Sequence, residues 1–152
     1  MPDCFISYSN QDQKLADFVC TELKQHGVDV FMATVSLKPG DQWSETIRIN
    51  LKTSNWIIFL ASRAACASAY VQQELGMAMG DLKRIIPIVW DMDPSQLPGW
   101  TNQAHAINLR GMTLENGKAK MASIANNIKN EKTKGFLIFG TIIFGLLMFA
   151  GK

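Results

Sequence analysis

A carboxylate and an aromatic ring stand one helical turn apart in the stretch SAYVQQEL, residues 68–75. In a helix Tyr70 and Glu74 are i, i+4 neighbours and point the same way. A carboxylate can stabilise developing positive charge, and a tyrosine ring can stack on a flat ligand. The residues alone favour the plainer interpretation, a helix-edge glutamate capped by water or by Arg63, because most helix carboxylates are only solvated.

The elements around the pair determine whether it faces a cleft. A helix over 68–82 would bury one stripe, with Leu75 in its middle, and leave Tyr70 and Glu74 at the edge of that stripe. The helix follows WIIFLA, residues 56–61, an apolar run typical of a strand buried on both faces of a parallel sheet. Ligands bind where such strands end, so we expect the pair near the carboxyl edge of the sheet.

The rest of the chain alternates strands and helices, which predicts an α/β fold with a parallel sheet and helices on both faces. The other predicted strands are 3–9, 28–33, 85–90 and a short one near 106–109, and the other predicted helices are 10–27, 44–53 and 114–132.

Composition limits the classes of function. The 152 residues suit one domain, and a net charge of +2 without basic runs between aromatics argues against a nucleic-acid partner. Cys4, Cys20 and Cys66 lie too far apart in the sequence to form a metal motif, so we expect buried free thiols of a reducing compartment and no metal site. The N-terminal residues do not have the pattern of a secretory signal.

The last segment, GFLIFGTIIFGLLMFAG at 135–151, carries no charge. As a helix it would span about 25 Å, slightly less than a hydrocarbon core, and flanking lysines could make up the difference. We therefore predict a domain at 1–132 and a single-pass membrane helix at 133–152, with lipid contacts through 135–151 and the domain facing the cytoplasm. The alternative is a helix packed in a core or between subunits.

Several motifs in this order resemble the TIR (Toll/interleukin-1 receptor) domain family of the bacterial kind. They are the opening strand DCFISYSNQD, the stretch LKPGDQWSETIRINLKTSNWIIFLAS, the Ser-x-Tyr-x-x-x-Glu segment at 68–74, and RIIPIVWD. The resemblance covers about residues 3–130. It implies a flavodoxin-like, five-stranded parallel sheet flanked by helices.

The resemblance also implies an activity. Many such members cleave NAD+ between nicotinamide and ribose, so Glu74 would be the catalytic residue and Tyr70 would line the pocket. Ser9 and Asn10 would hold the dinucleotide, and the 34–43 loop would join neighbouring TIR domains in an active assembly. NAD+ would be the substrate, with no further cofactor, in a prokaryotic antiviral defence system.

Two departures and two alternatives accompany this interpretation. Tyr70 replaces the usual tryptophan, and no acidic residue directly follows Phe31 at the second strand. One alternative is a non-enzymatic scaffold that only recruits other TIR domains. The other is a synthase that uses the same glutamate to make a cyclic ADP-ribose-like signal.

Overall fold

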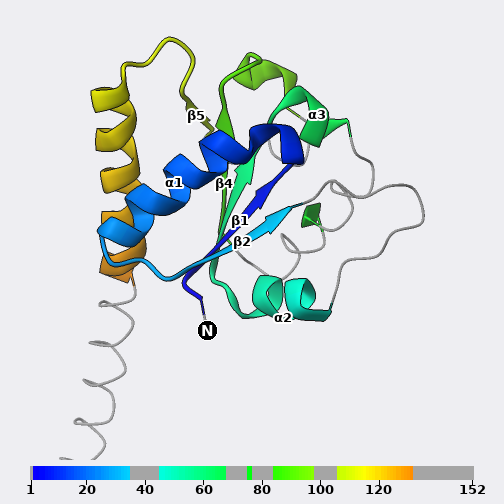
Figure 1. Ribbon diagram of the computed structural model, residues 1–152, viewed down its shortest axis with the longest axis vertical. Helices are drawn as coiled ribbons and strands as arrows, with labels where there is room; N and C mark the ends of the chain where they lie inside the picture. The colour runs from blue at the N-terminus through cyan, green and yellow to red at the C-terminus, as the bar shows by residue number, and fades with distance from the viewer. Residues whose placement is uncertain (1, 35–44, 68–74, 77–83, 98–105, 132–152) are drawn as a thin grey trace, which may run out of the picture.

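The fold is built on a five-stranded parallel sheet with the strand order β2-β1-β3-β4-β5 (Figure 1). The computed structural model describes residues 2–34, 45–67, 75–76, 84–97 and 106–131. The strands are β1 Cys4–Tyr8, β2 Val30–Thr34, β3 Trp56–Leu60, β4 Arg84–Val89 and β5 Ile107–Asn108. The predicted flavodoxin-like α/β architecture is confirmed.

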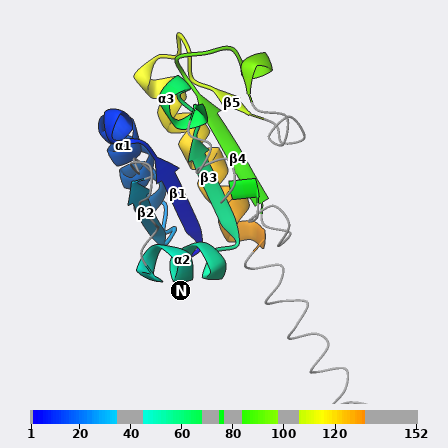
Figure 2. The same ribbon diagram turned by 90° about the vertical axis from the view of Figure 1, so that its right-hand side faces the viewer.

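Helices lie on both faces of the sheet (Figures 1 and 2). On one face α1 and the helix at 114–131 pack against the sheet, and on the other face lies α2. The remaining elements are short turns of helix. The bounds are η1 Asn10–Asp12, α1 Gln13–Gln25, α2 Glu45–Thr53, α3 Arg63–Cys66 and η2 Pro94–Gln96.

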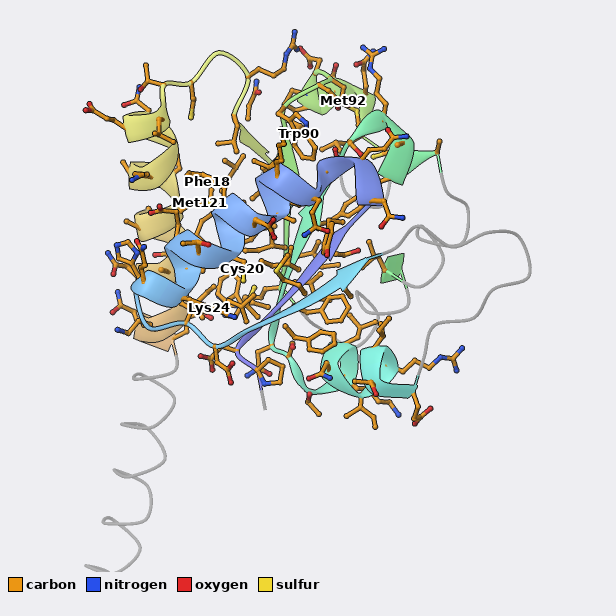
Figure 3. All side chains as sticks on the ribbon, viewed as in Figure 1. Phe18, Cys20, Lys24, Trp90, Met92 and Met121 are labelled. Atoms are coloured by element: carbon orange, nitrogen blue, oxygen red, sulfur yellow. The ribbon has the colours of Figure 1, made fainter. Side chains whose placement is uncertain are left out.

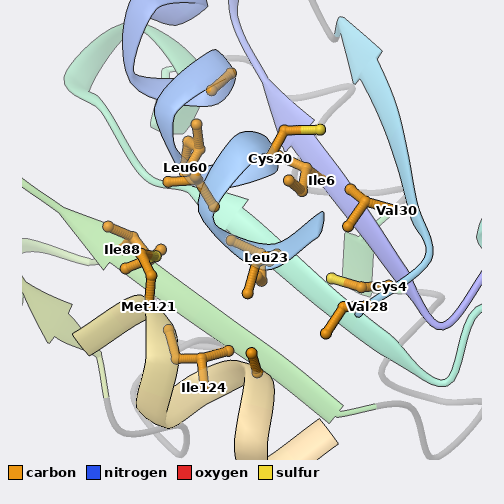
Figure 4. Close-up of a cluster of buried hydrophobic side chains, with 14 of the residues drawn as sticks. Cys4, Ile6, Cys20, Leu23, Val28, Val30, Leu60, Ile88, Met121 and Ile124 are labelled. Atoms are coloured by element: carbon orange, nitrogen blue, oxygen red, sulfur yellow. The ribbon is translucent and has the colours of Figure 1, made fainter. Parts of the chain in front are cut away.

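The position of β3 in the middle of the sheet explains why its sequence is apolar. Ile58 and Leu60 are buried in the cluster beneath α1 and the helix 114–131, where Figure 4 labels Leu60. Ile57 and Phe59 are buried in the cluster on the opposite face. Each fully buried side chain of this size stabilises the fold by about 1.5–3 kcal/mol. Both faces of β3 are therefore core, as expected for a parallel sheet covered on both sides.

Helix α1 begins later than predicted, because residues 10–12 form the 3₁₀ turn η1 before it. Its predicted apolar stripe is confirmed, with Val19 and Leu23 fully buried. The helix ends at Gln25. Gly27 follows it with a φ of +84°, which favours glycine, and the Gly27 amide donates to the Lys24 carbonyl at 3.0 Å.

The helix at 114–131 packs against α1. Met121 is fully buried and lies near Phe18 of α1 (Figure 3). Gly117 faces the Phe18 ring, and a Cβ added at this position would lie 3.7 Å from it. Lys118 Nζ lies 3.9 Å from the carboxylate of the buried Glu22 of α1. The helix thereby completes the core on this face.

The predicted membrane location is corrected. Within the described ranges, no helix has both the length and the apolar character that a bilayer crossing requires. The helix at 114–131 is amphipathic, with Met121 buried and Lys118 and Lys120 exposed, and a bilayer interior does not accommodate such a polar face. Residues 135–151, on which the prediction rested, lie outside the described residues, and the proposed boundary at 132/133 stays a prediction.

One buried polar group in the sheet lacks a partner. Ser7 lies on β1 between Ala33 of β2 and Phe59 of β3, and its side chain is fully buried. Among the buried side-chain polar atoms that the structure describes, the Ser7 hydroxyl oxygen makes no hydrogen bond. An unpaired buried hydroxyl costs about 1–3 kcal/mol.

We predict that Ser7→Ala leaves the free energy of unfolding unchanged or raises it by about 1 kcal/mol, because it removes this unpaired hydroxyl. The control is Ser54→Ala. Ser54 is equally buried, but its hydroxyl donates to the Asn50 carbonyl at 2.7 Å, so its loss should lower stability by about 1 kcal/mol. Urea unfolding of both variants measures the difference, and a Ser7→Ala loss as large as that of Ser54→Ala would contradict the argument.

Candidate functional site

The carboxyl ends of the parallel strands meet at one edge of the sheet, where α3 also lies (Figure 1). Ser9 follows β1, Ser62 follows β3 and Asp91 follows β4 within two residues of the strand ends. Clefts in open α/β sheets form at this edge, so it is the candidate site.

Ser9 is firmly held at the end of β1. It is buried and precedes η1, and its hydroxyl donates to Asp12 Oδ2 at 2.8 Å. The Asp12 amide in turn donates to the Ser9 carbonyl at 2.9 Å. Since the hydroxyl proton is engaged by Asp12, the Ser9 side chain would meet a ligand as an acceptor of hydrogen bonds.

Asn10, the next predicted binding residue, is the first residue of η1 and is exposed. Next to Ser9, the Tyr8 hydroxyl donates to Gln13 Oε1 at 3.2 Å and links β1 to the start of α1. The structure therefore brings Ser9 and Asn10 together at the carboxyl edge, one held and one open to solvent. Their role in binding stays a prediction.

The predicted catalytic pair, Tyr70 and Glu74, lies outside the described residues, and so do residues 35–43 of the 34–43 loop; Thr34 is the last residue of β2. The residue that follows Glu74 is described. Leu75 is fully buried in the cluster on the α2 face of the sheet, which confirms its predicted core position.

Arg63, considered from the sequence as a cap for Glu74, contacts Asp91 in the structure. Its Nε donates to the Asp91 carbonyl at 3.2 Å, and its main-chain amide donates to both oxygens of the Asp91 carboxylate at 3.3 Å each. We call this reciprocal contact the 63–91 clamp. It joins the start of α3 to the end of β4.

The sequence did not indicate the clamp. The two residues are 28 positions apart, and no local pattern links them. The available signal was positional: each of them follows a predicted buried strand, and parallel strands end at the same edge.

The neighbouring acidic residue, Asp93, has a structural role. Its carboxylate accepts the Ser95 amide at 2.9 Å, and the Asp93 amide donates to Gln96 Oε1 at 3.2 Å, which forms a capping box on η2. Hydrogen bonds from the main chain and the side chain of Ser95 to the charged carboxylate lower the pKa of the Asp93 carboxyl. Among the described residues, no group of three His, Cys, Asp or Glu side chains is arranged to hold a metal ion.

The three cysteines are free thiols, as predicted, although Cys66 is only half-buried. Burial, and secondly the negative charge of Asp91, raise the pKa of the Cys66 thiol to about 11. Burial also raises the thiol pKa of Cys4 and of Cys20. A raised pKa keeps most of a thiol population protonated near neutral pH, so we expect Cys66 to be a weak nucleophile despite its place at the site edge.

The sequence model of the family described as "TIR domain" matches residues 4–124, which is most of the chain. This chain belongs to the TIR domain family. The match includes all five strands and the first part of the last helix, and it confirms the resemblance found in the sequence.

A curated relative of this TIR domain is the protein named "Probable 2' cyclic ADP-D-ribose synthase BdTIR" of Brachypodium distachyon. The two are 32% identical over 97 residues, which is 62% of this chain and 43% of the relative. The chain thus spans less than half the length of that relative.

Solved structures show the same fold at low identity. The TIR domain of the Toll-related receptor TRR-2 from Hydra magnipapillata has a TM-score of 0.57 at 21% identity, covering 71% of this chain and 84% of that one. A TIR-STING receptor from C. gigas has a TM-score of 0.63 at 18% identity, covering 82% of this chain and 39% of that one. A diflavin flavoprotein from Nostoc sp. has a TM-score of 0.63 at 16% identity, covering 91% and 99%, so the flavodoxin-like class is shown as well.

We predict that Cys66 reacts with iodoacetamide at pH 8 at least about 10-fold more slowly than an unstructured thiol, because a pKa near 11 instead of 9.0 leaves it almost wholly protonated. The labelling rate should rise steeply as the pH approaches 11. Mass spectrometry of a Cys4→Ala/Cys20→Ala variant isolates this thiol, and labelling at the rate of a free peptide would contradict the assignment.

Proposed function

We propose that this TIR domain cleaves the bond between nicotinamide and ribose of NAD+, with Glu74 as the catalytic residue. The observation that carries the proposal is the 32% identity to a relative named as a cyclic ADP-ribose synthase, together with an aromatic–carboxylate pair at the family's Ser-x-Tyr-x-x-x-Glu segment. NAD+ is the natural source of the ADP-ribose unit in such a product.

The reaction needs only one carboxylate. Nicotinamide is cationic while attached to the ribose and leaves as a neutral molecule, so no general acid is required. The ribose gains oxocarbenium character as the bond breaks, and the Glu74 anion stabilises it, as one carboxylate of a glycosidase does. The Tyr70 ring stacks on a flat part of the dinucleotide.

Ser9 and Asn10 supply polar contacts to the dinucleotide at the end of β1. The Ser9 hydroxyl is held by Asp12 at 2.8 Å and Asn10 is exposed, so a ligand at the carboxyl edge meets one fixed and one accessible polar residue. This arrangement supports a role for both residues in binding the dinucleotide.

A cyclised product is the second candidate, and the name of the curated relative favours it. In that reaction the same glycosidic bond breaks, and a hydroxyl of the ADP-ribose itself, instead of water, attacks the cationic ribose carbon and loses its proton. Both products share Glu74, and the access of water decides between them.

Self-association is part of the proposal. One structure with this fold, at 18% identity and a TM-score of 0.51, is that of the TIR domains in the activated Roq1 resistosome, an assembly. We propose that contacts through the 34–43 loop assemble this domain and raise its activity, which would suit a triggered response such as antiviral defence.

The test follows nicotinamide release from NAD+ by chromatography, with and without a crowding agent. We predict that Glu74→Gln slows turnover by at least about 10²-fold, because a preorganised charge at the reacting centre contributes about 3–4 kcal/mol. The control is Glu115→Gln, an exposed glutamate near the start of the helix 114–131, which should cleave NAD+ at the wild-type rate.

Two further outcomes are informative. If the wild type releases no nicotinamide under crowding, and Glu74→Gln behaves identically, the chain is a non-enzymatic TIR scaffold. If nicotinamide appears, mass spectrometry distinguishes the products, because cyclic ADP-ribose is lighter than ADP-ribose by one water molecule.

A further inference from the structure

We propose that the 63–91 clamp is a positioning device for the proposed catalytic segment, with Asp91 and Arg63 acting as positioning residues. This inference rests on the proposed function of Glu74. It adds two residues, on separate elements, to which neither the family motifs nor the TIR resemblance assigns a role.

The clamp has two arms that run in opposite directions. In one arm the Asp91 side chain accepts the main-chain amide of Arg63, and in the other the Arg63 side chain donates to the main-chain carbonyl of Asp91. Each side chain thus holds the backbone of the other residue. Removing one side chain leaves the other arm in place.

Asp91 is a fixed anchor for this contact. The residues on either side of it pack on opposite faces of the sheet, Met92 in the cluster on the α2 face and Trp90 against the cluster beneath α1 (Figure 3). Asp91 itself is exposed and points to α3. The end of β4 therefore provides a firm base for the start of α3.

The clamp stands directly before the proposed catalytic segment. Arg63 begins α3, which ends at Cys66, and residues 68–74 follow after one further residue. The Ser62 hydroxyl accepts the Ala65 amide at 3.1 Å and fixes the same turn. On the far side, Leu75 is anchored in the core cluster on the α2 face. The described residues on both sides of the segment that holds Tyr70 and Glu74 are thus anchored.

Anchoring matters because the stabilisation that a carboxylate gives to a reacting sugar depends strongly on distance. A displacement of about 1 Å caused away from the reacting atoms can slow an enzyme by about 10²-fold. Asp91 and Arg63 need not touch NAD+ for this effect. Their loss should therefore lower kcat more than it raises KM.

The experiment measures nicotinamide release by Asp91→Ala, Asp91→Asn, Arg63→Ala and the double variant Arg63→Ala/Asp91→Ala. We expect Asp91→Ala to lower kcat by about 10-fold or more with KM within about 3-fold of wild type. Asp91→Asn keeps one acceptor oxygen and should retain more activity than Asp91→Ala. The double variant should lose less than the product of the two single losses, because both arms hold the same turn.

The matched control is Glu131→Ala, which breaks another contact of β4. Glu131 pairs with Arg84 at the opposite, amino end of that strand. This variant should change thermal stability as much as the clamp variants do, yet leave kcat unchanged. Equal kcat for Asp91→Ala and Glu131→Ala, in a wild type that cleaves NAD+ through Glu74, would overturn the inference and leave the proposed function intact.

Amide hydrogen exchange gives a readout that does not need NAD+. The Cys66 and Ala67 amides donate to the Ser62 and Arg63 carbonyls at 2.9 and 3.0 Å. Asp91→Ala should speed exchange over residues 63–67, and Glu131→Ala should not. Unchanged exchange would overturn the inference even if the wild type proves to be a scaffold without activity, an outcome that the first experiment identifies separately.

Discussion

The burial of β3 on both faces is the constraint on which the rest of the structure depends. Its side chains alternate between two separate core clusters, so neither face of the sheet can be left open without exposing apolar surface. The chain meets this demand with α1 and the helix 114–131 on one side and with α2 and Leu75 on the other. A sheet covered in this way must connect its strands by crossovers, and all strand ends of one kind then gather at one edge.

Polar residues lie at that edge because most side chains within the strands are packed in the core. Ser9, Ser62 and Asp91 follow their strands at the points where the sheet no longer requires apolar side chains. Each is engaged by a short-range or cross-strand hydrogen bond, and together they hold the loops in place. The apolar side chains of the strands thus stabilise the fold, and the residues just after the strands provide fixed polar groups.

Much of this was visible in the sequence. Continuous apolar runs such as that of β3 predict buried parallel strands, and the spacing of Val19 and Leu23 predicts the inward face of α1, because both patterns report burial directly. The four-residue helix α3 was not predicted, since it is too short to show a period. The Arg63–Asp91 contact was not predicted, because it depends on tertiary geometry and not on a local sequence pattern. The predicted membrane location rested on residues 135–151, which lie outside the described residues, and within the described ranges no helix is long and apolar enough to cross a bilayer.

Pro87 of β4 gives one more consequence of the strand arrangement. The Arg84 amide points toward β3, whereas the Val89 carbonyl, on the opposite side of β4, accepts the Leu109 amide. The main-chain groups of successive residues in a strand point to alternate sides. The ring nitrogen of Pro87 therefore faces away from β3. Strand β5 pairs only with Ile88 and Val89, and Pro87 lies just outside that ladder. A proline has no main-chain N–H to donate, so position 87 cannot contribute a donor that would extend the ladder between β4 and β5 toward the amino end of β4.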